Sequence, residues 1–242
     1  MRFVEEQEFG IARERHGERQ AAPLPGRKFG VLSVGDRSES EPLDRTVGRL
    51  DRSTGGTGRE AQAAVHQAML ETTRKENHPI DFWIHAGDMA YGTGRDVEFQ
   101  ARFFESYEGT LRQKVCWPTM GNHEGHTSKG TTGVGPYYDA YVVPTRGEAG
   151  GVASGTEAYY SFDHGNIHFI CLDSHDLDRK PTAAMARWLK ADLDKAQADW
   201  LIAFWHHPAY TKGSHDSDKE KDLTEMRRYL MPVIEAGGVD LV

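Results

Sequence analysis

The sequence predicts an α/β fold, because short apolar runs alternate with segments of helical periodicity along most of its 242 residues. Three of the apolar runs, FGVLSV, DFWIHA and residues 114–119, are soon followed by a Gly-Asp or Gly-Asn pair. Alternating strands and helices favour a largely parallel core, in which the carboxyl ends of the strands meet at one edge of the sheet. The length suits one large domain or two small ones.

The first half of the chain is expected to hold three strands and two helices. Residues 29–34 are apolar and predict a buried strand, whereas 37–58 are charged and then Gly-rich, which is typical of a loop or insertion. Alanine and aliphatic residues recur at helical spacing over about 59–74 and predict an amphipathic helix. Strands are then expected at 81–86 and 114–119, with an aromatic-rich helix at 97–111 between them.

The second half begins with a long loop at 125–155, which contains eight Gly and two Pro. The Asp163-His164-Gly165-Asn166 segment predicts a hairpin turn between two strands. Pro181 is expected to open the next helix, because proline favours the first turn. The remaining expected elements are strands at about 157–163, 167–173 and 200–205, a helix at about 217–236 and a last strand beginning at Val239.

Composition excludes several classes of protein. A net charge of −8 argues against a broad nucleic-acid-binding surface. No window reaches ~18 consecutive apolar residues, so no membrane span is expected, and the first 20 residues lack the apolar core of a signal peptide. Cys116 and Cys171 are too few for a disulfide framework and are expected in the core.

Polar side chains follow four of the expected strands: Asp36, Asp88, the pair Asn122-His123, and His206. Carboxylate, amide oxygen and imidazole together suit Fe, Mn or Zn rather than Ca or a thiolate site. A carboxylate can bridge two such metal ions about 3.5–4 Å apart. Two metal ions at this distance can clamp a transferring phosphoryl group and supply hydroxide as the nucleophile. The sequence therefore predicts a metal-dependent site at the edge where these strands end.

Three segments carry a resemblance to a known family: Gly87-Asp88-Met89-Ala90-Tyr91, Gly121-Asn122-His123-Glu124 and Trp205-His206-His207-Pro208. In this order they resemble the calcineurin-like metallophosphoesterases, and within them the purple acid phosphatase branch. The resemblance implies a four-layer α/β/β/α sandwich of mixed sheets flanked by helices. Residues 29–242 would form the catalytic domain, and residues 1–28 an N-terminal tail or linker remnant.

The resemblance also implies a dinuclear centre of Fe(III) and a divalent Fe, Zn or Mn ion. By match, Asp88 would bridge the two ions, and Tyr91 would bind the ferric one. Asn122 and His206 would bind the divalent ion, and Asp36 would be a first-metal ligand. Tyr91 decides the branch, because neither candidate for the first motif carries the histidine that generic members use, and a phenolate favours Fe(III).

The resemblance also implies that two histidines take part in substrate binding and proton transfer. His123 would contact the substrate phosphate or assist proton transfer to the leaving group, and His215 lies where the family often places another substrate-contacting histidine. Two other histidines near these motifs, His126 and His175, are expected to be loop residues rather than ligands. We also expect His164 and His168 to be turn and strand residues.

The sequence departs from the family pattern in two places. Ser38 stands where the first motif should have glycine, and Asp51 is an alternative to Asp36, because Ser53-Thr54-Gly55-Gly56 resembles the segment that the family carries after its first aspartate. Asp36 is favoured, because it lies at the end of the better strand. The closing Gly-His-x-His motif is not found before Val242, so the resemblance implies a domain whose final strands are missing and whose metals each lose one ligand.

The leading hypothesis is hydrolysis of phosphate monoesters by a dinuclear metal centre with metal-bound hydroxide as the nucleophile. The expected partner is a small phosphorylated substrate, with neither nucleic acid nor membrane as a stable partner, and oligomeric state is left open. A phosphodiesterase or nucleotidase on the same site and a catalytically impaired, truncated remnant are the alternatives. The resemblance suggests a secreted or periplasmic protein.

Overall fold

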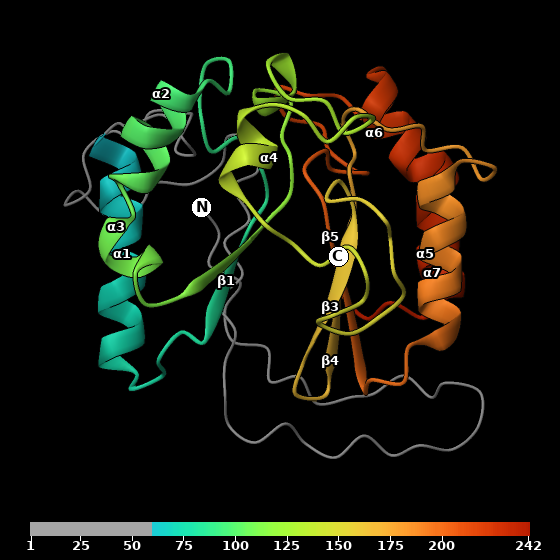
Figure 1. Ribbon diagram of the computed structural model, residues 1–242, viewed down its shortest axis with the longest axis horizontal. Coiled ribbons are helices and arrows are strands. Elements are labelled where there is room, and N and C mark those ends of the chain that lie inside the picture. The colour runs from blue at the N-terminus through green and yellow to red at the C-terminus, as the bar shows by residue number, and fades with distance from the viewer. Residues whose placement is uncertain (1–59) are drawn as a thin grey trace.

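The computed structural model describes residues 60–242 and arranges them in four layers (Figure 1). Two sheets lie face to face between two layers of helices, which confirms the predicted α/β/β/α sandwich. The helices on one side are α1 (Glu60–Lys75), α2 (Asp96–Phe99) and α3 (Glu108–Leu111), and those on the other are α5 (Ala184–Lys195), α6 (Lys221–Glu225) and α7 (Met231–Ala236). The expected strand at 29–34, Asp36 and Asp51 lie outside the described residues.

The first sheet pairs β1 (Phe82–His85) in parallel with β2 (Val115–Pro118). The second has the order β3 (Tyr160–His164), β4 (Ile167–Cys171), β5 (Trp200–Phe204), with β3 antiparallel and β5 parallel to β4. The largely parallel core expected from strand–helix alternation is therefore wrong for β3, because the predicted hairpin turns it back at Gly165-Asn166. Gly165 has φ +60°, which the first central residue of a type II′ turn needs.

Aromatic side chains fill the space between the two sheets. Phe162 stacks on Trp117 with ring centroids 3.9 Å apart and on Phe169 at 4.8 Å. Tyr160, which is completely buried, donates its hydroxyl to the Pro118 carbonyl at 2.7 Å and so links β3 to β2. The face-to-face packing fixes the two sheets relative to each other, and with them the strand ends that carry the polar motifs.

Two expected helices are interrupted. The segment 97–111 divides into α2, a π-helical turn η1 (Gln100–Phe104) and α3. The expected 217–236 helix starts at Lys221 and contains a second π-helical turn, η3 (Met226–Leu230), directly before α7. Pro232 in the first turn of α7 has no N–H to donate, so the ladder of i→i−4 hydrogen bonds cannot run through it.

Other boundaries also differ from the expectation. The helix expected from Pro181 begins at Ala184. The 125–155 loop overlaps a 3-10 turn η2 (Glu124–His126) and contains α4 (Pro136–Ala140). The expected last strand is reduced to a parallel bridge between Leu241 and Ile202. Of the two cysteines, Cys171 is completely buried and Cys116 is partly buried.

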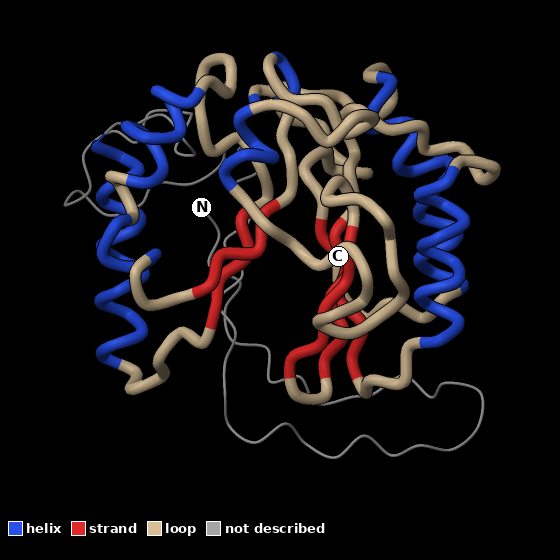
Figure 2. The backbone as a smooth tube through the Cα atoms, viewed as in Figure 1, coloured by secondary structure: helices blue, strands red, loops and turns tan. Residues whose placement is uncertain are grey.

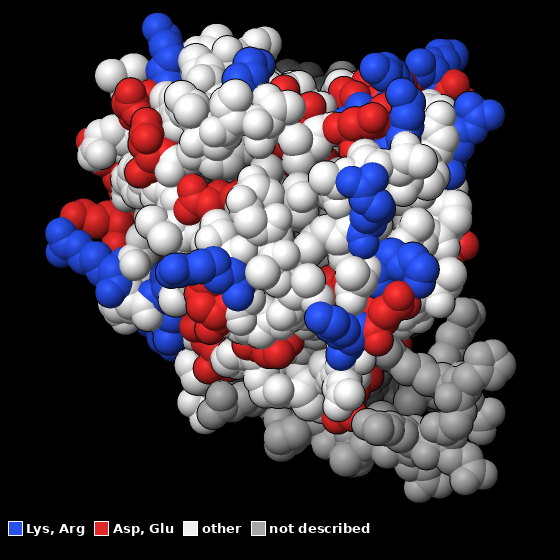
Figure 3. All heavy atoms as spheres, turned by 45° about the vertical axis from the view of Figure 1, so that its right-hand side comes forward, with Lys and Arg blue, Asp and Glu red and all other residues white. Residues whose placement is uncertain are grey.

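The long connections gather at one end of both sheets (Figure 2). β1, β2, β4 and β5 all run toward this end, so the residues that follow them face one another across it. The outer side of α5 is polar and carries the ion pair of Lys190 with Asp194 at 2.8 Å. Acidic and basic side chains are interspersed over the face that carries α5 and α7 (Figure 3). Among residues 60–242, no helix combines the length and apolarity needed to cross a bilayer.

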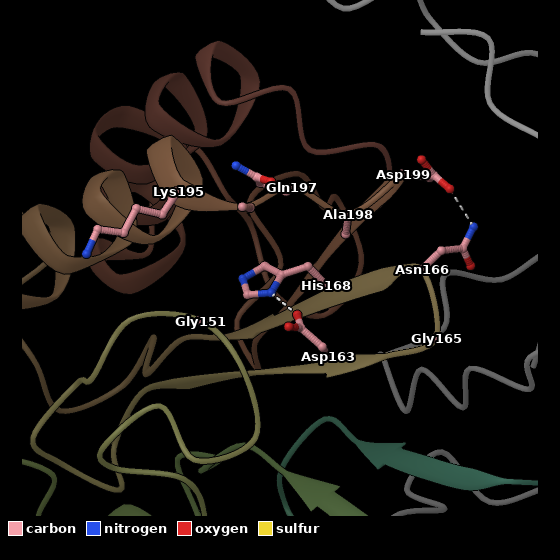
Figure 4. Close-up of a pocket in the computed structure, with 10 residues that line it drawn as sticks. Gly151, Asp163, Gly165, Asn166, His168, Lys195, Gln197, Ala198 and Asp199 are labelled. Carbon is pink, nitrogen blue, oxygen red and sulfur yellow. Dashed lines mark hydrogen bonds and ion pairs between the residues drawn. The ribbon is translucent and has the colours of Figure 1, made fainter.

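At the opposite end of the second sheet, His168 lies between two carboxylates beside a cavity of about 400 Å³ (Figure 4). Its Nδ1 is 2.6 Å from Asp163 and its Nε2 is 2.8 Å from Asp192. Asp192 is completely buried and also accepts the Ser161 hydroxyl and the Val152 N–H. Burial lowers the pKa of His168, but the bonds to Asp192 and Asp163 outweigh it and raise the pKa above its usual value.

We expect His168→Gln to lower the free energy of unfolding by about 3 kcal/mol, because it leaves Asp192 buried without a cationic partner. Because the pKa of His168 is raised in the folded state, its contribution to the free energy of unfolding is fully present below the unfolded-state pKa of about 6.5. That contribution is lost as the pH rises through the folded-state pKa. Urea unfolding of the wild type and of His168→Gln should therefore show a larger difference in the free energy of unfolding at about pH 5.5 than at about pH 8.5. His164→Gln, on the same hairpin, is the control. A gap that widens with rising pH would contradict this account.

Candidate metal centre

Asp88, Asn122 and His206 follow β1, β2 and β5, and the fold brings their side chains together. The Nε2 atom of His206 lies 2.9 Å from Asn122 Oδ1 and 3.5 Å from Asp88 Oδ1. Ligands bound at about 2.1 Å to one ion stand roughly 3–3.5 Å apart, so these separations fit a shared cation.

The glycines of the two motifs permit this close approach. Gly87 has φ +90° and Asp88 has φ +58°, a left-handed conformation that turns the chain sharply after β1. A Cβ atom on Gly87 would lie 2.8 Å from both the Gly121 backbone and the His206 ring, and one on Gly121 would overlap Asp88. The Gly-Asp and Gly-Asn pairs are therefore needed for the two loops to touch.

The buried carboxylate of Glu124 joins the loops that follow β1 and β2. Its Oε2 accepts the N–H groups of Asp88 at 2.8 Å and Gly121 at 2.9 Å, and its Oε1 accepts that of Ala90 at 2.9 Å. Burial and the neighbouring Asp88 charge raise the pKa of Glu124, while the bonds from Ala90 and Gly121 oppose that shift. The sequence motif includes Glu124 but gives it no role, because its partners become neighbours only in the folded chain.

The ring of His206 is oriented by the Ala86 carbonyl, which accepts from Nδ1 at 2.7 Å. With the hydrogen on Nδ1, the lone pair of Nε2 points toward two oxygen acceptors, Asn122 Oδ1 and Asp88 Oδ1. With Nε2 unprotonated, the three atoms present only lone pairs to one another and repel unless a cation lies among them. The donor set therefore fits a metal ion at this point.

His123 lies on the other side of Asp88. Its backbone N–H donates to Asp88 Oδ1 at 3.2 Å, its ring Nδ1 donates to the Gly92 carbonyl at 2.8 Å, and its Nε2 is 4.0 Å from Asp88 Oδ2. The ring of Tyr91 packs on it with centroids 3.8 Å apart. The two aromatic rings therefore form one wall beside the carboxylate.

Glu98 holds the loop that carries Tyr91. Its carboxylate accepts the N–H groups of Gly92 at 2.8 Å, Thr93 at 3.0 Å and Arg95 at 3.1 Å. Although burial raises the pKa of Glu98, these backbone bonds lower it more strongly, to about 2. An ionised carboxylate thus fixes the chain that follows Tyr91.

The hydrogen-bond partner of His215 is Glu220 rather than Asp88, Asn122 or His206. Its Nδ1 pairs with Glu220 at 2.7 Å, and its side chain is 60% exposed on the loop before α6. The structure thus brings together Asp88, Asn122, His123 and His206 with Tyr91 alongside. It does not bring His215 into that group, and Asp36 lies outside the described residues. The metal and substrate roles of all these residues remain predictions.

We expect Glu124→Gln to lower the free energy of unfolding by about 3 kcal/mol, because an amide nitrogen would face one of the N–H donors that the carboxylate now accepts. Equilibrium urea unfolding measures this change. Glu157→Gln is the control, since within the described part of the chain Glu157 accepts a single long bond of 3.4 Å, from the Val143 N–H. A loss of under about 0.5 kcal/mol in Glu124→Gln would show that the loops do not depend on this carboxylate.

Comparison with known proteins agrees with the geometry. Residues 56–242 match the family model described as calcineurin-like phosphoesterase. Purple acid phosphatase 23 of Arabidopsis thaliana is 35% identical over 140 residues, which is 53% of this chain and 29% of the relative. Purple acid phosphatase 18 of the same plant is 32% identical over 161 residues, 64% of this chain and 35% of the relative. The chain thus spans about a third of the length of these relatives.

A solved structure shares the fold. The purple acid phosphatase PPD1 from yellow lupin (Lupinus luteus) seeds superposes with a TM-score of 0.56 at 18% identity, over 77% of this chain and 32% of that one. The match to the family model covers most of the chain, and the relatives agree with it. This chain therefore belongs to the calcineurin-like phosphoesterase family, in its purple acid phosphatase-like branch.

Proposed function

We propose that this chain hydrolyses phosphate monoesters of small molecules at a dinuclear metal centre. The observation that carries the proposal is the convergence of three lone-pair donors, Asp88 Oδ1, Asn122 Oδ1 and His206 Nε2, at the strand ends. Membership of a phosphoesterase family supports the same reaction. The proposal extends to the reaction that the relatives' names state, acid phosphatase activity.

The residues divide between two ions. Asp88 would bridge them, Asn122 and His206 would hold a divalent Fe, Zn or Mn ion, and Tyr91 with Asp36 or its alternative Asp51 would hold Fe(III). Two bound ions would neutralise the phosphoryl oxygens and activate water near neutral pH. The protein's own contribution is orientation, since the Ala86 carbonyl fixes the His206 ring and Glu124 fixes the backbone on which Asp88 stands.

We assign proton transfer to the leaving oxygen to His123 rather than to His215. The Gly92 carbonyl holds the hydrogen on Nδ1 of His123, which leaves Nε2 on the side of the Asp88 carboxylate. His215 is engaged by Glu220 on an exposed loop, so we propose for it only a contact with substrate at the rim.

Asp88→Asn is expected to reduce hydrolysis of p-nitrophenyl phosphate at least about 100-fold, because an amide cannot bridge two cations as a carboxylate does. Asp139→Asn makes the same change of charge at an exposed position of α4 and should retain activity. Circular dichroism would show whether both variants fold. Turnover by Asp88→Asn at the wild-type rate would overturn the proposal, and faster hydrolysis of bis(p-nitrophenyl) phosphate by the wild type would favour a phosphodiesterase.

Tyr91→Phe tests the ferric ligand independently of turnover. After reconstitution with iron, the wild type should show a visible charge-transfer band from tyrosinate to Fe(III), and the variant should lose it. A phenylalanine keeps the ring that packs on His123, so a change in the spectrum would report the hydroxyl alone. An identical band in both proteins would exclude Tyr91 as the ligand, and the absence of a band from the wild type would favour an impaired remnant.

A further inference from the structure

A second group of ligand-type side chains lies beside the candidate centre. His175 follows β4, His207 follows β5 and Asp222 belongs to α6, and one ligand atom from each lies within 4.8 Å of the other two. The group shares no residue with Asp88, Asn122 and His206. We propose that His175, His207 and Asp222 bind a further divalent cation, with Zn²⁺ as the best match.

The donor set matches zinc chemistry. Two imidazoles and one carboxylate are a typical three-ligand set for Zn²⁺, and the fourth position stays open for water or a substrate oxygen. Ligand atoms around a tetrahedral zinc ion stand ~3.3 Å apart, so ligand atoms within 4.8 Å of one another need to approach by at most about 1.5 Å. The Nδ1 atom of His175 is buried and has no hydrogen-bond partner among residues 60–242, which leaves it free to take part.

Ser174 prepares His207 for this role. The Ser174 hydroxyl oxygen accepts the backbone N–H of His207 at 2.9 Å and lies 2.9 Å from its ring Nδ1. Metal-binding histidines usually donate their second ring N–H to such an acceptor, which leaves the other nitrogen for the metal. Ser174 therefore leaves Nε2 of His207 as the ligand atom.

Arg179 holds the other two ligands. Arg179 is only 4% exposed, and its guanidinium donates to Asp222 Oδ1 at 2.6 Å and to the backbone carbonyls of Ser174 at 2.8 Å and His175 at 3.2 Å. Asp222 Oδ2 remains available to a cation. The same guanidinium also pairs with Glu225 at 2.7 Å, and Lys221 lies 3.9 Å from the other oxygen of that carboxylate. A cation at His175, His207 and Asp222 would therefore approach Asp222 on the oxygen that Arg179 does not bind.

The direction of His207 explains how this group stays separate from the first. His206 and His207 lie in the bend that follows β5, and their side chains take different directions. His206 bonds to the Ala86 carbonyl after β1, whereas His207 contacts Ser174 after β4. The two rings are 4.8 Å apart and nearly perpendicular. The His206-His207 pair can thus supply one ligand to each of two adjacent metal sites.

Zinc stoichiometry of the metal-stripped full chain tests the proposal. After dialysis against Zn²⁺, elemental analysis should count one more zinc per chain in the wild type than in Asp222→Asn or His175→Gln. Glu225→Gln is the matched control, because it removes the other carboxylate on Arg179 and should keep the wild-type count. Circular dichroism checks folding, and His175→Gln decides the outcome if Asp222→Asn does not fold.

The Asp88→Asn background separates this site from the proposed dinuclear centre. In that background, long-range ¹H–¹⁵N spectra should show zinc-dependent shifts of the ring nitrogens of His175 and His207. If Asp88→Asn loses phosphatase activity but still binds this zinc ion, the site at His175, His207 and Asp222 is supported independently of the proposed function. Wild-type zinc counts in both Asp222→Asn and His175→Gln, or an equal loss in Glu225→Gln, would overturn the proposal.

Discussion

The candidate centre depends on one buried carboxylate. Glu124 accepts three backbone N–H groups from two loops, and those loops carry Asp88 and Asn122. The described part of the first sheet pairs two strands of four residues, and so short a ladder gives little resistance to sliding at its ends. Glu124 therefore sets the spacing of the two motifs, and the glycines at 87 and 121 allow the contact that it stabilises.

Sequence could predict the strand ends better than the groups that support them. Apolar runs followed by Gly-Asp or Gly-Asn located β1, β2 and the polar residues after them, because burial of a strand and the turn after it are local properties. The break in the 97–111 helix and the π-helical turn before Pro232 depend on tertiary packing and on one missing N–H. His175 lies in a loop, as expected, but its grouping with His207 and Asp222 could not be predicted, because these residues come from distant segments and no local spacing indicates them.

Buried charge is stabilised differently at the two ends of the sandwich. At one end, the protein supplies its own counter-ions: His168 lies between Asp163 and Asp192. At the other, Asp88 is buried, yet among residues 60–242 its side chain accepts only a 3.2 Å bond from the His123 N–H and has imidazole nitrogens at 3.5 and 4.0 Å. A buried carboxylate with so few hydrogen bonds from the described residues has oxygen lone pairs left over for a cation.

The same reasoning applies to Arg179. An arginine that is almost completely buried is stable only when its donors are bound, and two carboxylates and two carbonyls bind them. Asp222, one of those carboxylates, also faces His175 and His207. The role of Arg179 at this group is therefore mainly to hold Asp222 in position. Arg179 donates to Oδ1 of Asp222 and to Oε2 of Glu225, so Asp222 keeps its Oδ2 atom for another partner. The pairing of Arg179 with Glu225 thus stabilises the fold, whereas the group of His175, His207 and Asp222 can bind a ligand.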